Sequence, residues 1–126
     1  MIYFSTGGER DRTAYDISLN LYKNGINNIE LSGGKYTENH ADKLASIDQK
    51  LNFLVHNYFP PPVSPFVFNR ASLDSNISEV SLKHAFKAID YAKKLGSPIY
   101  SFHAGYLIDP DVNELGKRIS VKKLFN

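Results

Sequence analysis

This chain of 126 residues lacks cysteine, and it lacks any long run of apolar or of basic residues. Without cysteine it forms neither disulfides nor thiolate-bound metal sites, which fits a reducing, cytoplasmic setting. The formal net charge is only +2, with Lys and Arg scattered along the sequence, so a nucleic-acid partner is not expected. The apolar N-terminus meets Gly7, Gly8 and charged residues too early for a signal peptide or a membrane span. We therefore expect a cytoplasmic protein with no membrane partner.

The length and the ordinary globular composition suit a single domain with its own core. Short apolar runs alternate with helix-like segments, and these runs predict four strands that end near Ser5, Leu31, His56 and His103. Apolar residues at spacings of three and four predict helices between them. We expect these helices to run from Asp11 or Thr13 to Asn24, from about Asn39 to Leu51, and from Asn76 to Leu95.

Two details refine this pattern. Asn76, followed three residues later by Glu79, is typical of a capping box and predicts Asn76 as the N-cap of the third helix. His40 and His84 fall on predicted helices among polar neighbours, and we expect both at the surface. The polar stretch from Asn113 is either a loop or the beginning of a fourth helix.

Four βα units in a row predict an α/β fold with parallel strands in the order 1-2-3-4 and three helices on one face. Such a run belongs either to an open doubly wound sheet or to half of a (β/α)8 barrel. A complete barrel needs about 250 residues. Residues 1–126 would therefore make a partial barrel, its first four βα units.

Histidine ends the third and the fourth predicted strand, at His56 and His103. Because ligands bind at the carboxyl edge of a parallel sheet, we expect the two imidazoles to meet there. A neutral imidazole is a good ligand for a divalent metal, but zinc takes three or four protein ligands. Asp109, Asp111 or Glu30 is a candidate for a further carboxylate. The alternative is two ordinary strand-end histidines with hydrogen-bonded rings.

Three polar residues are candidates for substrate binding. Glu30 alternates with apolar neighbours in a strand that looks buried, where an ionised carboxylate is costly unless it is paired or solvated. It is either an acceptor for a substrate hydroxyl or an acid that faces water. Asn57 and Asn69 flank or lie in the long segment 59–75, which is stiffened by prolines and placed to carry a binding loop. In the same segment we expect Phe66 and Phe68 to pack on the core.

The order of five segments resembles the N-terminal half of the xylose-isomerase-like TIM barrels. These segments are Phe4–Gly7, Ile29–Gly34, Val55–Pro61, Phe66–Ser72 and Tyr100–Gly105. That superfamily contains sugar and sugar-phosphate isomerases and epimerases, and apurinic endonucleases of the endonuclease IV type. The resemblance covers nearly the whole chain and implies the first half of a (β/α)8 barrel.

The resemblance also implies a function. His56 and His103 match two zinc-binding histidines of the apurinic endonucleases, the second in a Phe-His-Ala-Gly setting where those enzymes have Phe-His-Pro-Gly. In the isomerase branch the metal ligands come mainly from later strands. The implied activity is that of a carbohydrate-metabolism isomerase or epimerase on a small sugar or sugar phosphate. A divalent metal (zinc, manganese or magnesium) would assist proton transfer next to a carbonyl, with Glu30 and Asn57 orienting hydroxyls.

Two other functions stay open: an endonuclease IV-like zinc phosphodiesterase that acts on abasic DNA, and a non-catalytic half-barrel fragment. Half a barrel would leave apolar residues such as Leu54 and Ile99 without partners, and its first and last strands would be open edges. We therefore expect a homo-oligomer, or a chain that needs a missing C-terminal half.

Overall fold

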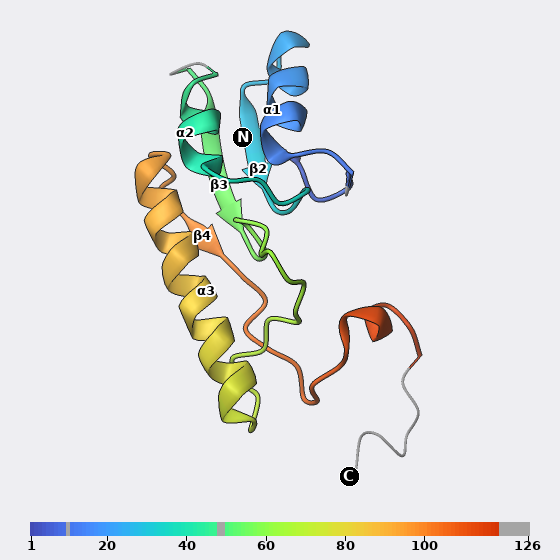
Figure 1. Cartoon of the computed structure of the whole chain (residues 1–126). Coiled ribbons are helices and arrows are strands. Elements are labelled where there is room, and N and C mark those ends of the chain that lie inside the picture. Colours follow the sequence, from blue (N-terminus) through green and yellow to red (C-terminus); the bar gives the residue numbers. More distant parts are fainter. Residues whose placement is uncertain (10, 48–49, 119–126) are drawn as a thin grey trace.

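The computed structural model describes residues 1–9, 11–47 and 50–118, and Figure 1 shows how their elements are arranged. One parallel sheet has the strand order β1-β2-β3-β4, which confirms the predicted order and direction. The strands are β1 (Phe4–Ser5), β2 (Asn28–Leu31), β3 (Asn52–His56) and β4 (Tyr100–Ser101). The helices are α1 (Ala14–Lys23), α2 (His40–Ala45) and α3 (Ser75–Lys94), followed by the 3-10 turn η1 (Val112–Glu114).

Alternation along β2 and β3 gives the sheet one apolar face. Leu31 pairs in register with Val55, and both are buried together with Ile29 and Phe53. All three helices add residues to this same core, among them Ala14, Leu44 and Ala88. The three helices therefore cover one face, as predicted.

The other face of the sheet is open. Glu30 and Leu54 pair in register there and are only half-buried, while Ile99, just before β4, is exposed. The expected loss of partners at Leu54 and Ile99 is thus visible in the part of the chain that the structure describes.

Helix α1 begins and ends with the predicted signals. Thr13 is its N-cap, and the Thr13 hydroxyl accepts the backbone N–H of Asp16 at 3.1 Å. At the other end Gly25 has a φ of +80°, and its N–H donates to the carbonyl of Tyr22. A left-handed glycine just past the last turn is the usual helix stop.

Helix α3 begins two residues earlier than predicted. Asp74 is the N-cap, and its carboxylate accepts the N–H of Asn76 at 2.8 Å, so the prediction of Asn76 as the cap is wrong. Asp and Asn both cap helices well. Here Asp74 precedes the first helical residue and is the cap, whereas Asn76 lies within the first turn. Glu79 does not reach back to the cap but pairs with Lys83 at 2.6 Å, one turn along the helix.

Helix α2 is shorter than the predicted segment from Asn39 to Leu51. The helix stops at Ala45, and the Ser46 hydroxyl donates to the carbonyl of Lys43 at 2.7 Å. Such a side-chain bond competes with continuation of the helix. Ile47 and Leu51 still pack against the core, but outside a helix.

His40 is buried, which contradicts the expected surface position. Only 3% of its surface is exposed, and its ring contacts the rings of Tyr36, Phe59 and Tyr91. Its Nε2 accepts the N–H of Thr37 at 3.1 Å, so the ring is neutral. Burial, together with the nearby lysines of α3 and α2, lowers the pKa of His40 from 6.5 to about 4.

His84 is also buried, at 7% exposure, and here again the surface prediction is wrong. The ring contacts Tyr58, Phe66 and Phe68, and its Nε2 donates to the carbonyl of Asn57 at 3.3 Å. Burial lowers the pKa of His84. The buried face of α3 consists of Ser81, His84, Ala88 and Ala92, whose spacings are helical.

Two further findings concern the C-terminal region and membranes. The stretch from Asn113 forms only the short turn η1 and irregular chain up to residue 118, and residues 119–126 lie outside the described part. None of the described helices combines the length and the apolar character that a bilayer crossing requires.

We expect the free energy of unfolding to fall as the pH drops from 6.5 to 4. His40 has a pKa of about 4 in the folded chain and about 6.5 in the unfolded chain. The unfolded state therefore binds more protons over this range, and acid favours it. His40 alone should cost about 2–3 kcal/mol between pH 7 and pH 4, with His84 adding in the same direction.

Urea denaturation at several pH values and one protein concentration measures this slope. His40→Phe keeps an aromatic ring but removes the titrating group, so its slope should be shallower. Asn20→Ala changes an exposed residue that does not titrate and should leave the slope as it is. An unchanged slope in His40→Phe would contradict the assignment.

Candidate functional site

His56 and His103 lie together at the carboxyl edge of the sheet. The centroids of their rings are 5.4 Å apart, and the ring planes meet at 83°. An ion bound tetrahedrally by two imidazoles through bonds of ~2 Å holds the ring centroids about 5 Å apart. The expected meeting of the two imidazoles is confirmed, and their separation suits a shared ion.

Ser101 anchors one of the two rings. In the β3–β4 register His56 pairs with Ser101, and the His56 Nδ1 lies 3.0 Å from the Ser101 hydroxyl. This contact fixes the ring and leaves Nε2 as the nitrogen for a metal or a substrate. His56 is half-buried and His103 is exposed, so both are within reach of solvent.

The spacing of Ser101 in the sequence could have predicted its place beside the site. Ser101 precedes His103 by two residues, and such residues share one face of a strand. The serine that orients His56 therefore belongs to the strand that leads to His103.

No third ligand joins the pair within the described residues, where no group of three histidine or acidic side chains is placed to hold a metal. Asp109, one of the candidates, accepts the Asn69 amide and the Ser72 hydroxyl, each at 2.7 Å. Asp111 lies at the N-terminus of η1, where its N–H donates to Glu114 at 2.8 Å. The pair thus supplies two of the three or four ligands that zinc takes.

Glu30 lies in the middle of β2, on the open face of the sheet. It pairs in register with Ser5 on one side and Leu54 on the other and is half-buried. Among the described residues, none hydrogen-bonds its carboxylate. This position suits either alternative that the sequence left open, and its role in substrate binding stays a prediction.

Asn57 ties β3 to its neighbours through its backbone. It has a φ of +41° and is buried, and its N–H donates to the carbonyl of Ser101 at 2.7 Å. Its own carbonyl accepts His84 and, at 3.4 Å, the hydroxyl of Tyr100, whose pKa burial raises to about 12. The side-chain Oδ1 is buried with no hydrogen-bond partner in the described structure. Its substrate role stays a prediction, since the observed contacts are structural.

The side chain of Asn69 makes several hydrogen bonds to a second loop. Its amide nitrogen donates to Asp109 at 2.7 Å and to the carbonyls of Tyr106 and Ile108. Its amide oxygen accepts the N–H groups of Ala71 and Tyr106 at 3.1 and 2.9 Å. These hydrogen bonds join two loops through the amide, and the role of Asn69 in substrate binding stays a prediction.

Gly105 lies against the side chain of Asn69. A Cβ on Gly105 would clash with the Asn69 amide oxygen and would come within 2.9 Å of the Ala71 nitrogen. Only glycine therefore lets the segment after His103 approach Asn69. The aromatic residues of the same loop pack as expected, since Phe68 is buried and Phe66 is half-buried against His84.

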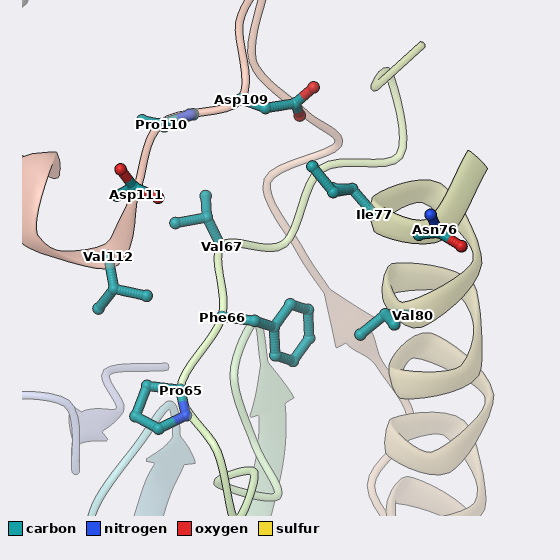
Figure 2. Close-up of a pocket in the computed structure, with 10 residues that line it drawn as sticks. All are labelled: Pro65, Phe66, Val67, Asn76, Ile77, Val80, Asp109, Pro110, Asp111 and Val112. Carbon is teal, nitrogen blue, oxygen red and sulfur yellow. The ribbon is translucent and has the colours of Figure 1, made fainter. Parts of the chain in front are cut away.

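A recess of about 350 Å³ lies elsewhere, between this loop and the C-terminal segment (Figure 2). Figure 2 shows Pro65, Phe66 and Val67 in the centre, with Ile77 and Val80 of α3 to one side. Neither histidine of the pair lines this recess. Its walls are mainly apolar, and one of its few polar groups, Asp109, is already bonded to Asn69.

No known protein family, curated protein or solved structure matches this chain in the comparisons made. The likeness to xylose-isomerase-like barrels therefore rests on the sequence segments and is carried forward as a proposal.

We expect Asn69→Ala to lower the free energy of unfolding by about 2–4 kcal/mol, because it removes a buried side chain and leaves partly buried N–H and carbonyl groups without partners. Asn20→Ala, an exposed change in α1, is the matched control and should stay near the wild-type value. Urea denaturation at pH 7 measures both. An Asn69→Ala variant as stable as the wild type would contradict this structural role.

Proposed function

We propose that this chain supplies half of a xylose-isomerase-like (β/α)8 barrel whose His56 and His103 hold a divalent metal ion. The site would isomerise or epimerise a small sugar or sugar phosphate. The observation that carries the proposal is the imidazole pair at the carboxyl edge, with ring centroids 5.4 Å apart. Essentially all (β/α)8 enzymes place their active sites at this edge.

The shape of the sheet supports the barrel part of the proposal. Its four strands are neighbours in sequence order, and the helices cover one face. In a closed barrel the other face turns to the lumen, where side chains of different strands meet in layers. Glu30 and Leu54, half-buried on the open face, are the side chains that would enter that lumen.

The residues of this chain divide the chemistry among them. His56, oriented by Ser101, would present Nε2 to the metal, and His103 would complete a pair of nitrogen ligands. Glu30 would accept a hydrogen bond from a substrate hydroxyl. A bound divalent ion polarises a carbonyl and so eases removal of a proton from the adjacent carbon. Two ligands alone hold a metal weakly, so turnover would need the metal in excess.

The chemistry of the two proposed ligands also supports a second candidate function. Both ligands are imidazoles, which suit zinc, whereas manganese and magnesium prefer oxygen donors. A zinc phosphodiesterase of the endonuclease IV type would use such a pair on abasic DNA. The small net charge of +2 offers little attraction for a nucleic-acid backbone, which is why we place this candidate second.

We expect weak binding of Zn²⁺, which calorimetry on the metal-free chain would measure. His56→Ala or His103→Ala should weaken it by tenfold or more, and Ser101→Ala by less, because the serine acts through His56. Binding should weaken as the pH falls, since protons compete for the imidazoles. Asp90→Asn, an exposed change in α3, is the control and should bind as the wild type does.

Tight stoichiometric binding by a single chain would contradict the two-ligand site and would indicate a further ligand. Assays with aldose and ketose phosphates and with abasic DNA, each with zinc, manganese or magnesium, separate the functions. Interconversion of the sugars supports the first proposal, and cleavage of abasic DNA supports the second. Inactivity in both assays favours a non-catalytic half-barrel.

A further inference from the structure

Both edges of the sheet are open in the described structure, and both carry exposed apolar side chains. The β1 edge presents Met1, Ile2 and Phe4 to solvent. At the opposite edge, Ile99 and Phe102 are exposed on either side of β4. An unpaired strand edge with apolar side chains is a ready template for association.

A groove runs beside the β4 edge. Ile89 and Ala92 of α3 form one wall, and Pro98, Ile99 and Phe102 form another. Figure 1 shows α3 lying alongside β4 at this end of the sheet. The groove and the strand edge together make one apolar surface.

We propose that a second copy of this chain occupies this surface. The β1 edge of each copy pairs with the β4 edge of the other, and the two contacts close a ring of eight parallel strands with two-fold symmetry. The inference deepens the proposed function by naming what completes the barrel: it rests on the barrel part of that proposal and on the strand edges, and not on the histidine pair.

The register of the sheet supports this pairing. Phe4 pairs with Ile29 and Ile29 with Phe53, and the β3–β4 register continues this row to Pro98. In an eight-stranded barrel with a shear of about eight, the row of paired residues shifts by about four residues along the strands for every four strands that it crosses. The partner's Phe4 then lies opposite Phe102.

In this register, apolar side chains at one edge meet aromatic side chains at the other. The same offset sets the partner's Ile2 opposite Tyr100. Strand partners share a face, and Tyr100 pairs with the buried Val55. Phe4 of one copy and Phe102 of the other would thus cover each other on the face that the helices already cover, whereas Ile99 lies on the opposite face.

The apolar area is sufficient for a dimer. Six large side chains at the two edges, Met1, Ile2, Phe4, Ile89, Ile99 and Phe102, are each exposed by 43–95%. With a full area of about 200 Å² each, they offer about 700 Å² per copy. Stable interfaces bury about 800 Å² per partner. Because every strand in such a ring is parallel, both histidine pairs would stand at one rim, where each site has the second half that it lacks.

Analytical ultracentrifugation at micromolar concentration in EDTA is the first test. We expect twice the mass of the single chain, independent of metal. Phe4→Asp and Phe102→Asp, one at each edge, should weaken dimerisation by tenfold or more. Leu73→Asp, a fully exposed change away from both edges, is the matched control and should remain dimeric. Circular dichroism checks that each variant is folded.

Disulfide cross-linking tests the register. The chain has no native cysteine, so only the introduced cysteines can form a disulfide. Facing residues of neighbouring strands lie ~4.8 Å apart, within the reach of a disulfide. A mixture of Phe4→Cys and Phe102→Cys chains should give linked dimers, whereas either variant alone should give none. A wild-type monomer, or Phe102→Cys linking by itself as readily as the mixture, would overturn the proposal. Loss of zinc binding by itself would leave this proposal intact.

Discussion

The parallel pairing of β3 with β4 is the constraint on which the candidate site depends. It sets His56 beside Ser101, and it carries His103 to the same edge. β4 itself has only two residues, so its place depends on contacts beyond the strand. Asn57 bonds to the carbonyl of Ser101, and Asn69 holds the segment that follows Gly105. Hydrogen bonds made by two loop residues therefore help to maintain the geometry of the site.

The order of the strands and the meeting of the two histidines could be predicted because both follow from local signals. Strand ends, glycines that end helices and helical spacing can each be recognised within a few consecutive residues. Parallel topology then brings the strand ends to one edge. The cap of α3 was missed because Asp74 and Asn76 are both good caps and lie only two residues apart. His84 was misplaced because its neighbours are polar, although its spacing to Ala88 and Ala92 puts it on the buried face.

The hydrogen bonds of Asn69 could not be predicted because their partners lie far along the chain. The amide contacts Tyr106, Ile108 and Asp109, close to forty residues away in sequence. An asparagine in a proline-rich loop looks the same whether it binds a substrate or a second loop. The contacts between the two loops depend on the packing of two irregular segments, and neither segment has a periodicity that the sequence could reveal.

A parallel sheet with one bare face also narrows the choice between the two architectures. Such sheets occur almost only with both faces covered. In a doubly wound sheet the second face is covered by helices, and this requires the strand order to reverse at some point. The order β1-β2-β3-β4 does not reverse, and right-handed crossovers then place every helix on the same side. Closure into a ring covers the second face without helices, by turning it toward the opposite strands. Closure would cover the open face and pair the open edges at the same time, which supports the proposed barrel.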